Sequence, residues 1–246
     1  MPTSWFEKLL RALSGQPARP QPPPKRYPLT DEQKLELARI LDILRAEGVL
    51  LSGEASLGEA IDVAETMGID DVDEFYGAAS VLASVEPLAN LAFFSDQVEV
   101  DPWYLVEMVE EVARLAGRDD LTDIKVRGVD SKFVDFARRG QFGPDNAVVA
   151  FTLDGVSQRV PFLAFSKNLP IGLFERLANV FIREDDPRRF YSAHNDQYEI
   201  LTRLTEEQAR RLNAALRTGA QSRRLNDALI EQTNPPAAFD EFLPLV

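Results

Sequence analysis

Four side chains in the second half of the sequence could do acid, base or metal chemistry. His194 is the only histidine of the chain, and Asp185, Asp186 and Asp196 lie close to it in sequence. An imidazole beside carboxylates can transfer a proton or bind a divalent cation. Asn and Asp are also common in polar turns for conformational reasons alone. The pattern therefore predicts either a carboxylate- or metal-assisted enzyme site between 185 and 196 or an ordinary turn between two strands.

No other group of residues identifies a reaction. The chain has 1 histidine and no cysteine, which excludes thiol nucleophiles, thiolate metal sites and two-histidine zinc sites. Glu107, Glu110 and Glu111 resemble the glutamates of a di-metal bundle, but the histidines of E-x-x-H motifs are missing, so a solvated helix face is the better interpretation. The Gly-rich phosphate-binding motifs and the G-x-S-x-G elbow are absent. We expect no cofactor, and a binding protein rather than an enzyme.

The acidic residues are concentrated in one part of the chain. The net charge is −13, from 27 Lys and Arg against 40 Asp and Glu. Residues 29–121 hold 22 of the acidic residues and only 5 basic ones, and residues 46–113 contain no Lys or Arg. Such a surface attracts basic proteins and repels nucleic acid. The competing interpretation is that the acidity serves solubility alone.

This acidic block motivates the leading hypothesis, which is a non-enzymatic module that binds a basic protein partner, of the immunity or inhibitor type. No nucleic acid is expected as a partner. The residues expected to contact the partner are all acidic and lie within the block: Glu59, Asp62, Asp70, Asp71, Asp73, Glu74, Glu107, Glu110 and Glu111.

Arginine is frequent late in the chain, and guanidinium groups can bind phosphate. Residues 122–246 nevertheless carry 17 residues of each sign. Pairing with carboxylates is therefore the expected role of these arginines, because a nucleic-acid-binding domain is normally net basic.

The composition divides the chain into five parts. Residues 1–14 predict an amphipathic helix, and residues 15–28 a proline-rich linker. The acidic helical region 29–121, an α+β region 122–232 with antiparallel hairpins, and a C-terminal tail 233–246 follow. An adaptor that recruits a protein through its N-terminal helix and proline-rich arm is the second alternative function. No apolar run is long enough to span a membrane, so we expect membrane association to be unlikely and the location to be cytoplasmic.

Helix starts are marked by recognisable capping residues. Capping boxes and an Asp-Pro pair predict four starts, at Thr30 with Gln33, Ser56 with Glu59, Asp101 with Pro102, and Thr205 with Gln208. A further start is expected at Asp71. Helix ends are expected at Gly68, Gly117 and Gly219, because glycine suits the left-handed position after a helix.

The second half changes to the alternating pattern of strands. Residues 147–153 and 156–165 flank Asp154-Gly155, which predicts a β-hairpin. A helix over residues 169–181 is expected to follow, and then two strands at 188–193 and 198–204. The apolar tail is expected to dock on its own domain or to bind a partner. The fold class is therefore α+β, with a mainly helical acidic half followed by an antiparallel sheet covered by helices on one face.

Overall fold

The structure is a computed structural model of the 246-residue chain. It describes residues 26–51, 53, 55–85, 88–95, 101–127, 147–164, 169–170, 172–194, 198–227 and 242–245. The predicted N-terminal helix, most of the proline-rich linker, Asp196 and most of the tail therefore lie outside the described residues.

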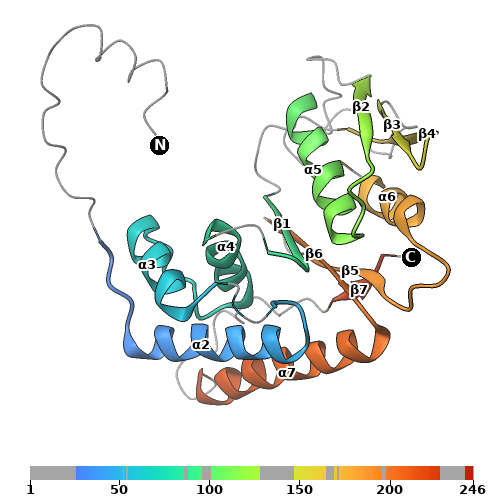
Figure 1. The fold of residues 1–246 in the computed structure, drawn as a ribbon. Coiled ribbons are helices and arrows are strands. Elements are labelled where there is room, and N and C mark those ends of the chain that lie inside the picture. Colours follow the sequence, from blue (N-terminus) through green and yellow to red (C-terminus); the bar gives the residue numbers. More distant parts are fainter. Residues whose placement is uncertain are drawn as a thin grey trace, which may run out of the picture.

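The described residues form an α+β fold, as the sequence predicts (Figure 1). The helices are α2 (Asp31–Ala46), α3 (Leu57–Met67), α4 (Phe75–Val85), α5 (Pro102–Leu115), α6 (Leu173–Phe181) and α7 (Glu206–Asp227). The strands are β1 (Leu91–Ser95), β2 (Thr122–Arg127), β3 (Ala147–Leu153), β4 (Val156–Phe162), β5 (Arg189–His194), β6 (Tyr198–Leu204) and β7 (Leu243–Pro244). Every strand pair in the described chain is antiparallel.

Most of the predicted local signals are confirmed. Thr30 and Ser56 form complete capping boxes at the starts of α2 and α3, and Asp101 caps α5 with Pro102 in its first turn. The hydroxyl of Thr205 accepts a hydrogen bond from the amide of Gln208 at 3.3 Å. The predicted hairpin is β3–β4, and the strands β5 and β6 pair as expected.

Three predicted helix boundaries are wrong. Asp71 does not cap α4, because its carbonyl accepts the Glu74 amide in a turn and the helix begins at Phe75. Helix α6 begins at Leu173 because Gly172 is left-handed, with φ of 77°. Helix α7 continues through Gly219 to Asp227, since glycine permits a left-handed cap but does not impose one.

The strands form two sheets. The larger has the order β1-β6-β5-β7, and the smaller has the order β2-β3-β4. Strand β1 comes from the acidic region and pairs with β6, from Leu91 opposite Thr202 to Ser95 opposite Tyr198. Neither β1 nor β2 is predicted from the sequence. The run that forms β1 does not alternate, because both of its faces are covered.

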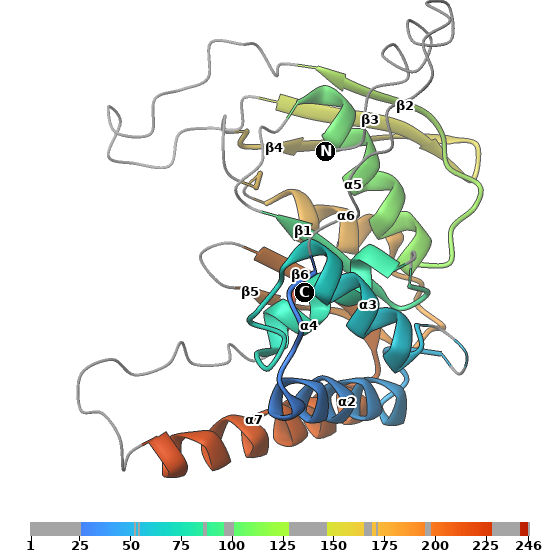
Figure 2. The same cartoon turned by 90° about the vertical axis from the view of Figure 1, so that its left-hand side faces the viewer.

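Helices cover both faces of the larger sheet, not one face as predicted (Figures 1 and 2). Leu91, Ala193 and Ile200 face a core shared with α2, α3, α4 and α7. On the other face, Phe94 and Leu201 join a second core formed with α5, α6 and the smaller sheet. The larger sheet is thus the central layer between two apolar cores.

Candidate functional site

The predicted contact residues lie on two separate surfaces. Glu59 and Asp62 belong to α3, and residues 70–74 connect α3 to α4, on one side of the larger sheet. Glu107, Glu110 and Glu111 belong to α5, which packs on the other side. The acidic block is continuous in sequence but does not form one continuous surface.

The α3 surface is partly neutralised by basic residues from outside residues 46–113, the stretch that contains no Lys or Arg. Arg26 pairs with Asp62 and lies 3.9 Å from Glu65, and the Lys34 ammonium lies 3.7 Å from Glu65. Glu59 accepts hydrogen bonds from the Ser56 hydroxyl at 2.7 Å and the Ser56 amide at 2.9 Å, which hold the pKa of Glu59 below its usual value. Glu59 therefore completes a helix cap, and α3 is less suited to a partner than its sequence suggests.

The loop between α3 and α4 holds like charges together. Asp71 is exposed as a residue, but the partial burial of its carboxylate raises its pKa above the usual value, and the charges of Asp70 and Asp73 raise it further. The loop lies directly on α4, because a Cβ at Gly77 would be 2.2 Å from the Asp71 carbonyl oxygen. The close packing of the loop thus keeps these carboxylates near one another.

We expect Asp71→Asn to stabilise the fold at pH 7 by about 0.5 kcal/mol, the usual scale of surface effects. A raised pKa means that the folded state binds this proton more tightly than the unfolded state. The neutral carboxyl of Asp71 therefore stabilises the folded state. In the natural protein this stabilisation is lost as the pH rises through the folded-state pKa of Asp71. Urea denaturation of both proteins from pH 3 to 8 measures the effect, and the gain should vanish at the acidic end. A gain that is independent of pH would contradict this account.

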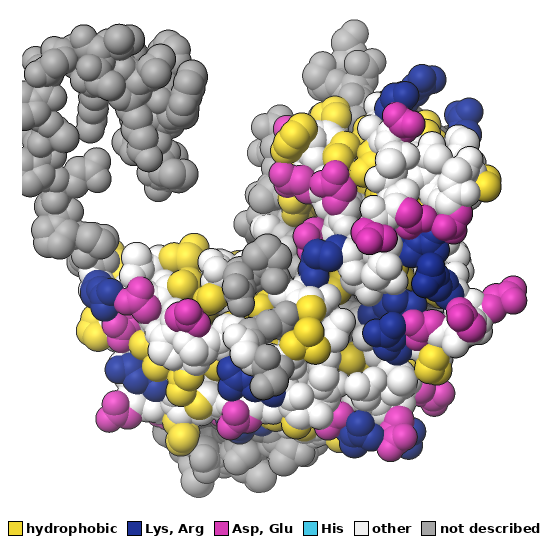
Figure 3. Space-filling model, viewed as in Figure 1, with side chains coloured by type: hydrophobic (Ala, Val, Ile, Leu, Met, Phe, Trp, Pro, Cys, Tyr) yellow, Lys and Arg dark blue, Asp and Glu magenta, His cyan; other side chains and the backbone are white. Residues whose placement is uncertain are grey.

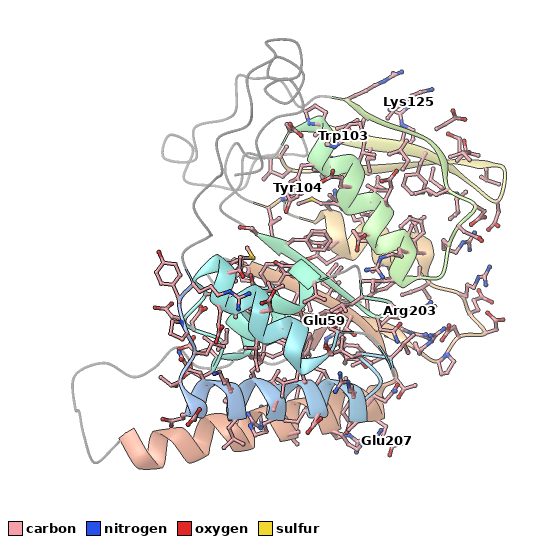
Figure 4. All side chains as sticks on the ribbon, turned by 60° about the vertical axis from the view of Figure 1, so that its left-hand side comes forward. Glu59, Trp103, Tyr104, Lys125, Arg203 and Glu207 are labelled. Carbon is pink, nitrogen blue, oxygen red and sulfur yellow. The ribbon has the colours of Figure 1, made fainter. Side chains whose placement is uncertain are left out.

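The outward face of α5 combines an aromatic ring with carboxylates, and Figure 4 labels the ring, Trp103, near the start of the helix. Trp103 is 73% exposed, the indole Nε1 donates a hydrogen bond to Glu107 Oε1 at 2.9 Å, and Glu110 lies exposed about one turn further along. Residues at these spacings share one side of a helix. Figure 3 shows several acidic side chains along α5.

The basic residue near the end of α5, Arg114, is directed away from this face. Arg114 donates to the carbonyls of Leu88, Ala89 and Leu91, the last at 2.9 Å, and pairs with Glu111 at 2.6 Å. These contacts tie the end of α5 to the start of β1. Among the described residues no ion pair neutralises Glu107 or Glu110, so the α5 face (Trp103, Glu107 and Glu110) keeps its negative charge.

The four residues of the predicted enzyme site are not all brought together. Asp186 precedes β5 and His194 ends it, so the strand separates them, and Asp196 lies outside the described residues. Asp185 lines two cavities of about 420 and 460 Å³ on either side of the α6–β5 loop. In the part of the chain that the structure describes, no group of three or more His, Asp or Glu side chains could hold a metal ion.

Asp186 is held by two arginines. Its carboxylate lies 2.7 Å from Arg188 and 3.0 Å from Arg203, and the Arg188 hydrogen bonds hold the pKa of Asp186 well below its usual range. A carboxylate held ionised in this way is a poor proton donor. Arg203, one of the late arginines expected to pair with carboxylates, is 2% exposed and also donates to the Ala116 carbonyl at 2.7 Å.

His194 has a partner that the sequence analysis misses. Its Nδ1 lies 2.9 Å from Glu199 Oε2, and its carbonyl accepts the Tyr76 hydroxyl at 2.9 Å. His194 and Glu199 are directly opposite in the β5–β6 register, so the predicted hairpin contains the signal for this pair. A carboxylate on one ring nitrogen orients the imidazole and leaves the other nitrogen directed away from it.

Trp103 is the other residue that sequence reasoning misses. The signal was its helical spacing, since Trp103 lies two residues before the buried Leu105 and therefore on the other side of the helix.

No helix within the described ranges is long and apolar enough to cross a membrane. No protein-family model, no curated protein and no solved structure matches the chain in comparisons with known proteins.

Proposed function

We propose that this protein binds a basic protein partner through the α5 face. The observation that carries the proposal is the exposed Trp103, fixed by its hydrogen bond to Glu107 and accompanied by Glu110 on the same side of α5. Tryptophan is enriched among the residues that dominate binding energy, and an exposed ring already held in place loses little conformational freedom on binding.

The chemistry of the α5 face favours Lys and Arg side chains. A cation placed over an indole ring is attracted to the π system, and the neighbouring carboxylates can accept its hydrogen bonds. The inward contacts of Arg114 leave this position open to a cation from another protein. A partner that buries the ring would exclude water from the charge pairs around it, which strengthens them.

The class that fits this chemistry is a non-enzymatic protein of the immunity or inhibitor type, in which an acidic surface captures a basic target quickly. We place this interaction in the cytoplasm, because a chain with no cysteine gains no disulfide from an oxidising compartment. Nucleic acid is not the expected partner, since the α5 face would repel phosphate.

We expect Trp103→Ala to weaken partner binding about 30-fold, the effect of losing about 2 kcal/mol at an interface hot spot. The partner is first captured from native lysate with the tagged full-length protein and identified by mass spectrometry. Its affinity is then measured by calorimetry with both proteins purified, at 50 and 500 mM NaCl. Glu107→Gln should also weaken binding and should reduce the salt dependence.

Glu207→Gln is the matched control, because Glu207 is an exposed helical glutamate on α7 and its loss changes the net charge equally. The control should retain the affinity of the natural protein. Equal affinities of the Trp103→Ala and natural proteins, or an affinity that salt does not change, would refute the proposed surface.

A further inference from the structure

The last described residues of the chain, Phe242–Leu245, occupy a groove formed by α4, α7 and β5. Phe242 is 2% exposed, and β7 pairs with β5 at the edge of the larger sheet. We propose that this groove is a peptide-binding site for extended segments of another protein with the pattern Phe-x-Pro-Leu, and that the chain's own C-terminal residues are its resident, displaceable ligand.

The groove recognises the peptide backbone. Asn213 of α7 donates from Nδ2 to the Phe242 carbonyl at 2.9 Å and accepts the Phe242 amide on Oδ1 at 2.9 Å. Beyond this point Leu243 and Pro244 lie opposite Ser192 and Tyr191, and the Leu245 amide donates to the Phe190 carbonyl at 3.0 Å. Main-chain bonds of this kind are the basis of strand addition at a sheet edge, and they do not depend on the side chains of the ligand.

The groove selects mainly through Phe242. The Phe75 ring of α4 meets the Phe242 ring edge to face, with centroids 5.5 Å apart. Leu243 is 60% exposed, so this position tolerates many side chains. Pro244 has no N–H and suits an edge strand, where one side of the backbone has no strand partner. These contacts define the pattern of a buried aromatic residue followed two positions later by proline.

The walls of the groove have contacts besides those with the segment. Phe75, Tyr191 and Leu212 belong to the core shared by α2, α3, α4 and α7, which Phe242 joins together with many other residues. A cavity of about 330 Å³, lined by Tyr191, Asn213, Arg217 and Phe242 among others, lies beside the bound Phe242. The resident segment therefore does not fill the site, and the cavity leaves room for a different ligand.

A tethered ligand has a high effective concentration, so the resident segment must be weakened before a free peptide can be detected. The test uses the full chain with Phe242→Ala and a fluorescein-labelled peptide of sequence EFLPLV, which corresponds to residues 241–246. Fluorescence anisotropy should show saturable binding to this variant and at least tenfold weaker binding to the natural protein. The control peptide EALPLV should not bind, and Asn213→Ala added to Phe242→Ala should reduce binding at least tenfold.

A folded Phe242→Ala protein that does not bind EFLPLV, or that binds both peptides equally, would overturn the proposal. If that variant does not fold, hydrogen exchange of the natural protein decides the matter. The Leu245 amide must then exchange faster than the amides shared by β5 and β6, because the segment leaves without global unfolding. Exchange of the Leu245 amide at the rate of global unfolding would also overturn the proposal. A dimer that depends on Phe242 would overturn it too, because the groove would then bind a second copy of the chain.

Discussion

Replacing Arg203 with methionine should lower the free energy of unfolding by about 3 kcal/mol, the scale of breaking one partner from a buried ion pair. The guanidinium lies 3.0 Å from Asp186 and 2.7 Å from the Ala116 carbonyl, and its carbon Cζ lies 5.8 Å from the Phe190 ring centroid. Methionine fills part of the volume, but it leaves the last turn of α5 without this donor. Urea denaturation followed by circular dichroism measures the loss.

Arg188→Met is the matched control. Arg188 bonds the same carboxylate, but its side chain is 44% exposed, so water can replace its contacts. We expect its loss to cost under about 1 kcal/mol, as for exposed pairs. Equal losses in the two variants would contradict the view that Arg203 is the buried link between β6, α5 and the loop before β5.

The pH dependence gives a second measure of the same pair. The Arg188 hydrogen bonds, and to a smaller extent the charge of Arg203, lower the folded-state pKa of Asp186. The contribution of this carboxylate to stability is therefore present above the usual Asp pKa of about 3.9 and is lost as the pH falls towards the folded value. The difference between the natural and Arg203→Met proteins should therefore shrink below about pH 4. A difference that stays constant down to pH 2 would show that Arg203 stabilises the fold through Ala116 alone.

Replacing Gly77 with alanine should destabilise the protein by about 2 kcal/mol, the range for inserting a group into a filled space. Alanine normally stabilises the interior of a helix relative to glycine, by up to about 1 kcal/mol. Here the new Cβ would lie 2.2 Å from the Asp71 carbonyl oxygen and 2.6 Å from its carbon, so the loop must move away from α4. The free energy of unfolding in urea measures the effect.

Gly58 of α3 provides the matched control, because a Cβ there would have no neighbour within 4 Å. Gly58→Ala should be neutral or slightly stabilising. If both variants were equally stable, the close contact of the loop with Gly77 would not exist in solution.

The local sequence is sufficient to predict helix caps and turns where residues close in the chain interact directly. Ser56 and Glu59 cap α3 as predicted, because both partners of the box lie within one helical turn. Asp154 and Gly155 form the β3–β4 turn, with φ of 50° and 73°, because their own conformational preferences suit it. These signals are short in range, so no knowledge of the rest of the fold is needed to read them.

The acidic block shows where sequence reasoning stops. Residues 46–113 contain no Lys or Arg, so this stretch cannot neutralise its own charge locally. Arg26 and Lys34 nevertheless reach Asp62 and Glu65 on α3. Charge pairing depends on distance through space, so a count along the chain cannot show which carboxylates remain available to a partner.

Local patterns account for the α+β class, the helix caps and the β3–β4 and β5–β6 hairpins, because these follow from interactions between residues close in the chain. Packing between distant segments sets the pairing of β1 with β6, the ion pair of Arg203 with Asp186, and the pairing of Lys34 with Glu65. Burial and pairing depend on partners distant in sequence, because their apolar faces are covered together when the two cores form on either side of the larger sheet.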